Sequence, residues 1–571
     1  MDDSVSNPNA EVTLLKEQPF LSRNVIIALC LMALICLFYG ISEYRSFVMH
    51  EVFASSTARQ MYLTGDHVVP YHAGHPRLRK PPLIYWMISG SAHLMGEFNE
   101  FSARFPSAVC AVLLSALMGL WAGKWYGRSV GYLTAFVQAT CYYAILWSRK
   151  AEVDMCLTLL NVAALYLIAT QPVRQTWKQG FLRWTMIFSL MGLSTLAKFY
   201  YGPAFVFAIA GVFWLIQGRW KDVVHTINPV GWILWLAPFG IWAWVVSTKR
   251  PNAWEVWQQE TIGRALGVFG STPLWFYVLD IPFITLPWTP LWLLELKNSW
   301  RSAWNENDAR ERFLWVWFVV PLIVVTLQPD KHTNYAMTFV PVLSILAGRR
   351  LSACLVQDRW LSFQWSTRQA VSLTILNVFG GITLSVLVLK QWPEARWTAI
   401  FSVMVVGVGC STVAWLFRLQ RQKAGVLSLL VCYTAFVIIF FGEIQPLRDP
   451  KRNEVTFNQQ VREKFPEEDI IGYKMGVVGS YYLGPHYWDF SQRMSPKDFR
   501  EQIAGKHSVI VVVKNDQVQE LKQYGTITPI MKANEDEKYH KTEKSKQPAC
   551  WELIPRHSLQ METPPNTAKR Q

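Results

Sequence analysis

Long apolar runs separated by short polar segments dominate the first 443 residues of the chain. A helix that crosses ~30 Å of hydrocarbon needs roughly 17–25 mostly apolar residues, and by that measure the pattern predicts about thirteen membrane-spanning helices. They are expected at residues 25–42, 104–123, 130–147, 154–169, 182–197, 203–217, 228–247, 274–296, 312–327, 335–348, 370–390, 398–417 and 425–443. The first 443 residues therefore indicate an all-α polytopic membrane protein.

The pattern changes after residue 443. Residues 509–513 are five consecutive Val and Ile between Lys506 and Lys514, which predicts a buried strand. Weaker strand candidates are residues 469–473 and 550–554, and residues 495–504 suit a short helix with proline at its first position. We expect a small soluble α/β domain at 444–555, a disordered tail at 556–571 and another at 1–24.

Composition supports membrane insertion. Of the 571 residues 51% are hydrophobic and only 17% are charged, which excludes a string of soluble domains. The first apolar run has no small-residue cleavage site after it, so we expect a retained helix. The net charge of +15 could suggest nucleic acid, but the basic residues are spread between the predicted spans, so we expect no nucleic-acid partner. The nine cysteines include no CxxC pair and are interpreted as packing residues.

The loops between the spans fall into two classes. One class is short and basic, at residues 124–128, 174–178, 219–221, 297–310, 349–359 and 418–423. The positive-inside rule places such loops in the cytoplasm. The N-terminus would then be cytoplasmic, and an odd number of spans would place the C-terminal domain outside, in the periplasm of a bacterial inner-membrane protein.

The other class of loops carries unusual polar chemistry, at residues 50–86, 149–154, 198–201, 249–272 and 330–335. The first outer loop, residues 44–103, stands out because residues 50–86 hold four of the eleven histidines. Early in this loop Phe53, Ala54 and Met61 suit an amphipathic helix lying in the membrane interface. These loops alternate with the basic ones, so their side chains are expected to converge on the outer face. A solvated connector remains the ordinary alternative for any single residue.

Several ionisable residues in these loops are candidates for a site. Asp154, two residues after Glu152, stands at the start of a predicted span, where an ionisable residue is a functional hypothesis. Lys80 precedes two prolines that stiffen its backbone. With Lys198, Arg264 and Lys331 it would supply cations on one membrane face, as a phosphate-bearing substrate requires, although each alone could be a snorkelling flank.

Other chemistries lack support in the sequence. His67, His72 and His75 follow neither a helix face nor a zinc-ligand spacing, so no metal site is predicted from them. The chain has no Gly-rich dinucleotide motif, Walker loop or nucleophile elbow, which argues against nucleotide-driven transport and soluble hydrolase chemistry.

The first outer loop resembles a known family. Its residues 50–86 read H-E-V-F-A-x(3)-A-R-Q-M-x(3)-G-D-H-x-x-P-x(3)-G-x-P-x(3)-K-P-P-L-x-Y-W. This is similar to the first outer loop of the aminoarabinose lipid A transferases, within the protein O-mannosyltransferase superfamily of GT-C membrane glycosyltransferases. The similarity continues in order at residues 104–108, Asp154, residues 197–198, 251–254, Glu260, Arg264, residues 286–288 and residues 331–335.

The resemblance implies a GT-C fold and transfer of a sugar from a polyprenyl-phosphate donor to a lipid, glycan or protein acceptor outside the cytoplasm, with inversion at the sugar. It implies the following site: Asp154 and Glu51, with His50 as an alternative base, at the acceptor; Lys80, Arg264, Lys331, Lys198 and Arg79 around the carrier phosphate; and Tyr335 on phosphate or sugar. No metal ligand set is assigned, and a divalent metal is left open.

Two departures from the family pattern affect the interpretation. His50 stands where the family has its catalytic Asp, and Arg77 and Arg79 replace a usual Tyr and Glu, which suggests a more anionic donor or acceptor. Two alternatives therefore remain. A secondary transporter of an anion would show paired repeats and charges near the midplane, which the sequence lacks. A catalytically inactive lipid-binding relative is the other alternative.

Overall fold

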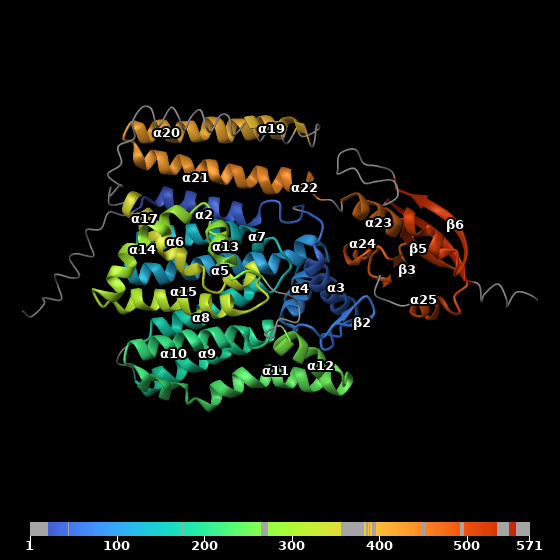
Figure 1. Cartoon of the computed structure of the whole chain (residues 1–571), viewed down its shortest axis with the longest axis horizontal. Helices are drawn as coiled ribbons and strands as arrows, with labels where there is room; N and C mark the ends of the chain where they lie inside the picture. Colours follow the sequence, from blue (N-terminus) through green and yellow to red (C-terminus); the bar gives the residue numbers. More distant parts are fainter. Residues whose placement is uncertain are drawn as a thin grey trace, which may run out of the picture.

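A computed structural model of the chain describes residues 21–43, 45–172, 176–263, 272–355, 382–383, 386, 389–390, 396–447, 449, 452–490, 496–533 and 547–555. A bundle of helices forms the larger part, and a smaller part that contains a β-sheet lies at one end of it (Figure 1). The helices α3 and α4 and the hairpin β1–β2 lie between the two parts. This intermediate layer is the first outer loop of the sequence.

The first half of the bundle holds ten α-helices, one 3-10 helix and a hairpin in the part of the chain that the structure describes up to residue 249. They are α2 (Arg23–Phe38), α3 (Met49–Thr64), β1 (Tyr71–His72), β2 (His75–Pro76), α4 (Leu83–Met95), α5 (Glu100–Tyr126), α6 (Arg128–Thr140), α7 (Tyr142–Ser148), α8 (Asp154–Ala169), α9 (Trp177–Lys198), α10 (Tyr201–Ile216), the 3-10 helix η1 (Trp220–Thr226) and α11 (Pro229–Lys249).

Shorter and more broken helices follow. They are α12 (Ala253–Gln258), the π-helical turn η2 (Gln259–Gly263), α13 (Phe276–Ile284), α14 (Thr289–Trp304), α15 (Ala309–Leu327), α16 (Thr333–Ala336), α17 (Pro341–Leu355), α19 (Arg396–Val403), η4 (Met404–Gly409), α20 (Cys410–Arg418), α21 (Gln422–Ile439), η5 (Phe440–Ile444) and α22 (Gln445–Leu447). The predicted span at 370–390 lies largely outside the described residues.

Within the described residues, four helices are long and apolar enough to cross a membrane: α5, α9, α11 and the continuous helix Lys423–Leu447. A fifth would be α13 with α14, which meet at 113°, and α2, α8 and α10 are shorter apolar helices. The predicted span 130–147 is divided between α6 and α7 at Cys141, and 335–348 is divided between α16 and α17. The count of about thirteen spans therefore stays a prediction.

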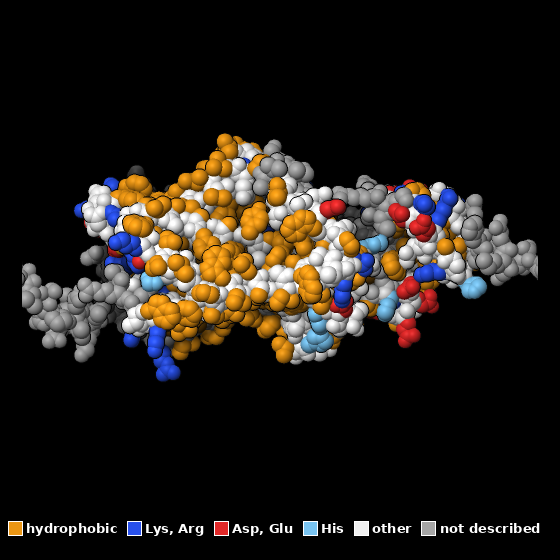
Figure 2. Space-filling model, turned by 90° about the horizontal axis from the view of Figure 1, so that it is seen from below, with side chains coloured by type: hydrophobic (Ala, Val, Ile, Leu, Met, Phe, Trp, Pro, Cys, Tyr) orange, Lys and Arg blue, Asp and Glu red, His pale blue; other side chains and the backbone are white. Residues whose placement is uncertain are grey.

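The surface of the bundle suits a lipid environment. Figure 2 shows hydrophobic side chains across most of the visible face of the helical part. Lys and Arg side chains gather at its left end, away from the C-terminal part. Leu215, Ile233 and Val278 are each more than half exposed. Apolar surface of this extent on a protein marks contact with lipid or with another protein.

Local signals at several helix starts explain why the helices begin where they do. Asn99 accepts a hydrogen bond from the Ser102 amide at the start of α5, and Thr176 accepts one from Gln179 at the start of α9. Asn228 does the same for α11, where Pro229 follows at the first position. Polar caps of this kind satisfy amides that the helix itself leaves unpaired.

The C-terminal part contains a five-stranded mixed sheet in the order β4-β3-β5-β7-β6. Its elements are α23 (Arg452–Lys464), β3 (Ile470–Tyr473), α24 (Val477–Tyr481), β4 (Tyr487–Phe490), α25 (Pro496–Ile503), β5 (Val509–Lys514), η6 (Asn515–Gln517), α26 (Val518–Leu521), β6 (Gly525–Lys532) and β7 (Pro548–Pro555). The three predicted strands are β3, β5 and β7, and the predicted helix is α25. The Val/Ile run of β5 is buried because β5 is central.

The first outer loop is fastened to the C-terminal part by specific contacts. The Arg59 guanidinium stacks 4.0 Å from the centre of the Tyr481 ring and donates to the carbonyls of Tyr481 and Gly484. The Tyr482 hydroxyl accepts from the Phe47 amide at 2.9 Å. The hairpin turn at Gly74 (φ 81°) lies so close to Trp488 that a Cβ there would come within 2.5 Å of the indole. The two parts therefore form a packed junction.

Helix α3 is helical as predicted, but its environment differs from the prediction. The sequence suggested an amphipathic helix lying in the membrane interface. In the structure its small residues Ala54, Ser55 and Ala58 are buried, and the helix packs on α4 and on Tyr481 and Tyr482. Small side chains allow close approach of neighbouring backbones, so protein covers much of the surface that was assigned to lipid.

Candidate functional site

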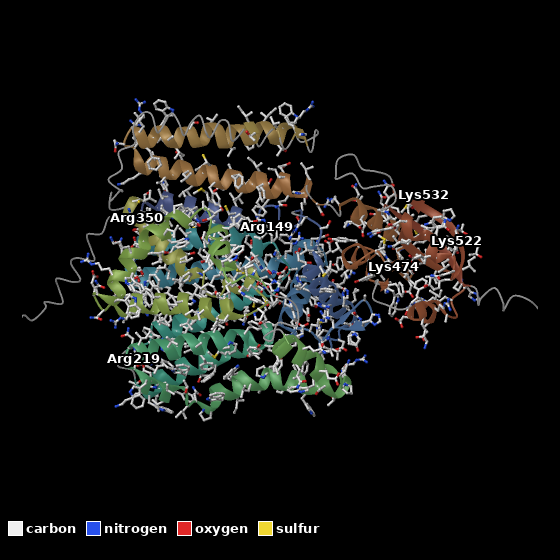
Figure 3. All side chains as sticks on the ribbon, in the orientation of Figure 1. Arg149, Arg219, Arg350, Lys474, Lys522 and Lys532 are labelled. Carbon is white, nitrogen blue, oxygen red and sulfur yellow. The ribbon has the colours of Figure 1, made fainter. Side chains whose placement is uncertain are left out.

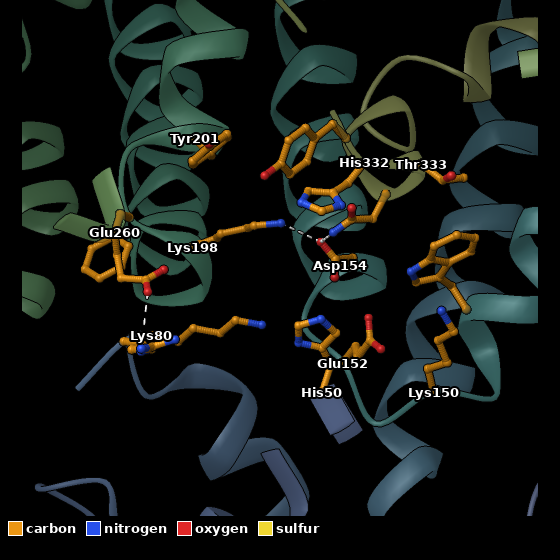
Figure 4. Close-up of a pocket in the computed structure, with 15 residues that line it drawn as sticks. His50, Lys80, Lys150, Glu152, Asp154, Lys198, Tyr201, Glu260, His332 and Thr333 are labelled. Atoms are coloured by element: carbon orange, nitrogen blue, oxygen red, sulfur yellow. Dashed lines mark hydrogen bonds and ion pairs between the residues drawn. The ribbon is translucent and has the colours of Figure 1, made fainter. Parts of the chain in front are cut away.

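A cavity of about 360 Å³ lies where the first outer loop meets the ends of α8 and α9 (Figure 4). Six segments far apart in the sequence converge on it: the start of α3, the loop before α4, the end of α7 with the loop to α8, the junction of α9 and α10, the turn η2, and α16 with the residue before it. Its lining consists of His50, Arg79, Lys80, Trp147, Lys150, Glu152, Asp154, Lys198, Phe199, Tyr201, Glu260, His332, Thr333, Asn334 and Tyr335. Seven of these residues are Lys, Arg, Asp or Glu, which is far more charge than an ordinary apolar cavity holds.

Asp154 is the first residue of α8 and joins three segments at the centre of the cavity. Its Oδ1 atom accepts a hydrogen bond from Lys198 Nζ at 2.7 Å, which is also an ion pair, and another from Asn334 Nδ2 at 2.9 Å. The residue is only 3% exposed. Both bonds end on one oxygen, so the second carboxylate oxygen is the one left for a ligand.

Close packing of α8, α9 and α10 holds the Lys198–Asp154 pair in place. The Ser194 hydroxyl donates to Asn161 Oδ1 at 2.8 Å, which links α9 to α8. Gly202 at the start of α10 lies against both groups, and a Cβ there would come within 1.8 Å of Ser194 Oγ. Only a glycine allows this approach, so the sequence Gly-Pro after the tyrosine pair has a packing reason.

Two cations from the first outer loop face the cavity from the side opposite α8. Lys80 is held by the two prolines that follow it, and no carboxylate lies within 4 Å of its amine among the described residues. Burial lowers the pKa of Lys80, while the nearby charge of Asp154 acts in the opposite direction. Arg79 pairs with Glu260 of η2 at 3.5 Å across the edge of the cavity. Lys80 is half-buried, and a cation drawn partly out of water without an anion beside it is costly, which marks Lys80 as a binding group.

Glu152 and His50 lie beside Asp154 in the cavity (Figure 4). Burial raises the pKa of Glu152, against the opposing effect of Lys150. Partial desolvation by the surrounding protein, reinforced by the charge of Lys80, lowers the pKa of His50 to about 4, although the side chain keeps contact with solvent. The imidazole is therefore neutral at pH 7 and able to accept a proton or a hydrogen bond.

Glu51, a predicted catalytic residue, lies outside the cavity. Its carboxylate is fully buried, pairs with Arg104 Nε at 2.9 Å and accepts from the backbone amides of Ala151 and Val48. The Arg104 guanidinium also donates to the carbonyls of Ile41 and Arg45. Glu51 thus joins α3 to α5 and to the segment before α3.

Lys331 also lies outside the cavity lining. It is 4% exposed, and its amine donates to the carbonyls of Thr272 and Gln328. These bonds fix the loop that carries Asn334 and Tyr335. Arg264 falls outside the described residues. The structure therefore brings together six of the predicted site residues: His50, Arg79, Lys80, Asp154, Lys198 and Tyr335.

Tyr335 forms one wall of the cavity together with aromatic neighbours. Its ring lies 5.7 Å from that of Tyr201 and 5.2 Å from Lys198 Nζ. Within the described residues no group of three His, Cys, Asp or Glu side chains could hold a metal ion. A requirement for a divalent metal stays a prediction to be tested.

The sequence assignments omitted several residues of the cavity. Glu152 was noted beside Asp154 but given no role, and Glu260 was noted only as part of a motif. Trp147, Lys150 and Tyr201 carried no assignment. Closeness in sequence to an assigned residue could have identified three of them as cavity residues. Lys150 and Glu152 lie within four residues of Asp154, and Tyr201 lies three residues after Lys198.

Comparison with known proteins adds an independent line of evidence. The family model described as dolichyl-phosphate-mannose-protein mannosyltransferase matches residues 79–244. An undecaprenyl phosphate-alpha-4-amino-4-deoxy-L-arabinose arabinosyl transferase from Pseudomonas paraeruginosa is 25% identical over 78% of this chain and 79% of its own length. The corresponding transferase 2 of Sodalis glossinidius is 27% identical over 57% of this chain and 59% of its own length, so the match spans less than two thirds of that relative.

A solved structure matches nearly the whole fold. The crystal structure of ArnT from Cupriavidus metallidurans bound to undecaprenyl phosphate superposes with a TM-score of 0.74 at 16% identity, covering 93% of this chain and 98% of that chain. The same architecture therefore extends over the bundle and the C-terminal part. The predicted GT-C membrane fold is confirmed at this level.

Proposed function

We propose that the chain, as a divergent relative of the GT-C membrane glycosyltransferases that include the aminoarabinose lipid A and protein O-mannosyl transferases, transfers a sugar from a polyprenyl-phosphate donor to an acceptor on the extracytoplasmic face. The observation that carries this proposal is the cavity in which the carboxylate of Asp154 lies among Lys198, Lys80 and Arg79. Glycosyl transfer needs both charges, because a cationic sugar centre develops while an anionic phosphate departs.

Lys80 and Lys198 are the groups that would receive the carrier phosphate. Lys80 has no ion-pair partner among the described residues, so a phosphate oxygen would supply the missing counter-charge. Lys198 is already paired with Asp154, and its amine retains donors for a second oxygen. Arg79 is about half exposed at the cavity edge, where its pair with Glu260 could open to a ligand.

Asp154 and His50 are the groups that would serve the acceptor. The acceptor oxygen attacks the anomeric carbon, a new C–O bond forms, and the bond to the carrier phosphate breaks, so the carrier leaves as polyprenyl phosphate. Where the acceptor oxygen carries a proton, the free oxygen of Asp154 or the neutral imidazole of His50 takes it. A single displacement of this kind inverts the anomeric configuration. Glu51 takes no part in this scheme.

The position of the charges also bears on the transporter alternative. Asp154 is the first residue of α8 and Lys198 is the last of α9, so both lie at helix ends. A transport site near the membrane midplane would place such charges within the helices. This placement supports a transferase whose site opens at the membrane surface, with a lipid, glycan or protein as acceptor.

The proposal is tested by the lipid that the protein retains. The full chain, purified in nanodiscs, is examined by native mass spectrometry for bound polyprenyl phosphate or its glycosylated form and then titrated with undecaprenyl phosphate. We expect specific binding that Lys80→Gln weakens by roughly ten- to a hundredfold, since a charge-assisted contact contributes roughly 1.5–3 kcal/mol. Lys249→Gln is the matched control, because Lys249 is exposed and outside the cavity. Absence of carrier binding by the wild type, or equal binding by Lys80→Gln, would refute the proposal.

A further inference from the structure

The short helix α13 carries one ionisable residue that the proposed mechanism does not use. Its sequence FYVLDIPFI is apolar except for Asp280 and the Tyr277 hydroxyl. On this helix Val278, Leu279 and Phe283 are each more than half exposed, as expected of side chains that face lipid. A carboxylate in an apolar membrane segment is costly and is by default a functional candidate. Asp280 therefore calls for a partner that explains its position.

That partner is the segment 330–335, which borders the cavity. Asp280 Oδ1 accepts a hydrogen bond from the Thr333 hydroxyl at 2.9 Å. The Tyr277 hydroxyl, one turn earlier on α13, donates to the His332 carbonyl at 3.1 Å. Residues three apart lie on the same face of a helix, so one face of α13 binds two successive residues of the segment.

The same segment holds the carboxylate of Asp154. Asn334 directly follows Thr333, and its Nδ2 atom donates to Asp154 Oδ1 at 2.9 Å. In Figure 4, His332 and Thr333 lie on one side of Asp154. Thr333 donates to α13 and Asn334 donates to α8, with one peptide bond between the two residues, so the two hydrogen bonds act in series.

Other contacts fix the beginning of the segment rather than Asn334. Lys331 donates from its backbone amide and its amine to Thr272 and Gln328. These bonds hold a residue three positions before Asn334, whereas Thr333 is its immediate neighbour. The other oxygen of Asp280, Oδ2, has no hydrogen-bond partner in the part of the chain that the structure describes. Removal of this carboxylate therefore breaks a single hydrogen bond, whose effect can be measured.

We propose that Asp280 is a positioning residue for sugar transfer. Through Thr333 it fixes the place of Asn334, and Asn334 occupies one oxygen of Asp154 so that the other faces the reacting groups. Asp280 itself touches no substrate. The inference rests on the proposed function, because the orientation of Asp154 affects transfer only if an acceptor reacts beside it.

This role should affect the rate of transfer more than the binding of the carrier. A displacement of about 1 Å in a reacting group can lower a rate by roughly 10²-fold. Lys80 and Lys198, the proposed carrier-phosphate groups, belong to other segments and should keep their positions. Loss of the hydrogen bond between Thr333 and Asp280 is therefore expected to lower kcat and to leave the affinity for undecaprenyl phosphate unchanged.

The test breaks this bond from both sides and then restores it. Asp280→Leu removes the acceptor and Thr333→Val removes the donor, and each is expected to slow turnover of the co-purifying lipid-linked sugar in native membranes about tenfold. Asp280→Asn keeps an acceptor oxygen and Thr333→Ser keeps the hydroxyl, so turnover should recover to within about threefold of the wild type. The double variant of Asp280→Leu and Thr333→Val should be no slower than either single variant. Thr248→Val, at an exposed position of α11 outside the cavity, is the control.

Two further measurements separate positioning from binding and from folding. The affinity for undecaprenyl phosphate in nanodiscs should stay within about twofold of the wild type in every variant, because only kcat is expected to fall. Amide hydrogen exchange in residues 332–336 should be faster in Asp280→Leu and Thr333→Val than in Asp280→Asn, while exchange in the rest of the bundle is unchanged.

The possible results decide between distinct conclusions. Full turnover in Asp280→Leu and Thr333→Val, additive losses in the double variant, or no recovery in Asp280→Asn would overturn the positioning role. A loss of undecaprenyl phosphate affinity equal to the loss of turnover would overturn it as well. If Asp280→Leu fails to fold, Thr333→Val decides between these outcomes. Failure of the wild type to bind undecaprenyl phosphate or to consume the lipid-linked sugar would instead overturn the proposed function itself.

Discussion

The orientation of Asp154 and the protonation state of His50 are both set by the residues around them. The carboxylate of Asp154 is held by Lys198 of α9 and Asn334 of α16, so it is fixed before any substrate arrives. Pre-organised charge of this kind costs no rearrangement during the reaction. His50 lies close by with a histidine in place of the family's acid, and its protonation state decides what it can do.

The pH dependence of His50 gives a prediction at the residue scale. Its folded-state pKa of about 4 is below the unfolded value near 6.5, because burial and Lys80 disfavour the imidazolium. Sugar transfer should therefore persist as pH falls from 7 to about 5, without the loss near pH 6.5 that an unperturbed histidine base would show. The measurement is the pH profile of turnover of the co-purifying lipid-linked sugar.

The lowered pKa of His50 also predicts that the folded protein loses stability as the pH falls. Between about pH 6.5 and 4 the unfolded chain binds more protons at this position than the folded chain, so folding is weakened as pH falls through that window. His72, whose pKa burial lowers to about 3, acts in the same direction. A His50→Gln variant should show a smaller drop in Tm between pH 7 and 5 than the wild type. An activity midpoint near 6.5 that His50→Gln abolishes would contradict the neutral-imidazole assignment.

At the scale of elements, the pair between Glu51 of α3 and Arg104 of α5 is a buried link between two helices. Both side chains are fully buried, and removal of one partner from such a pair typically destabilises a protein by about 3–5 kcal/mol. Glu51→Gln should therefore lower Tm strongly, yet the folded fraction should bind undecaprenyl phosphate with normal affinity at low temperature. Glu97→Gln, at an exposed position just after α4, is the control. If Glu51→Gln instead kept a normal Tm but lost undecaprenyl phosphate binding, Glu51 would have to be assigned to the binding site.

The hairpin β1–β2 gives a second prediction for elements. A Cβ on Gly74 would lie within 2.5 Å of Trp488, whereas a Cβ on Gly65 would meet nothing within 4 Å, although both glycines have φ near +75°. Left-handed strain alone costs about 1–2 kcal/mol, and Gly65→Ala measures that strain. Gly74→Ala should add faster hydrogen exchange in residues 71–76 and 452–490, because it forces the C-terminal part away from the hairpin. If Gly65→Ala and Gly74→Ala had equal effects, the close contact between Gly74 and Trp488 would not be what holds the hairpin to the C-terminal part.

At the scale of the whole molecule, charge divides between the two ends. Arg219 and Arg350 lie at the end of the bundle away from the C-terminal part, which carries Lys474, Lys522 and Lys532 (Figure 3). Tyr201 begins α10 at the cavity, and Arg219 lies just past its other end, about 24 Å away for a helix of this length. The cavity and the C-terminal part therefore share one side of the bundle.

Orientation in the membrane can be tested from this arrangement. If the basic end is cytoplasmic, a cysteine in Lys249→Cys should react with a membrane-impermeant maleimide added to intact cells or right-side-out vesicles. A cysteine in Arg219→Cys should react only after permeabilisation. The unsubstituted chain gives the background from its native cysteines, of which Cys30 is exposed. The reverse labelling pattern would place the cavity in the cytoplasm.

The sequence predicted much of the fold because the relevant signals are local. Apolar runs marked the helical bundle, and five consecutive Val and Ile marked the central strand β5. The points at which a helix is interrupted were harder to predict. The kink between α6 and α7 and the 113° bend between α13 and α14 occur inside continuous apolar runs, where hydropathy alone carries no information on direction.

The sequence by itself determined which residue types could serve a phosphate and a sugar, and the order in which they follow one another. Only the tertiary structure decided which of them meet. Successive residues on a helix point about 100° apart, so His50 faces the cavity while Glu51 turns inward to Arg104. Lys331 donates to the carbonyls of Gln328 and of Thr272 in the segment before α13, whereas Trp147 and Lys150 line the cavity. Composition specifies the available charges, but desolvation and the choice of partner depend on how distant segments pack.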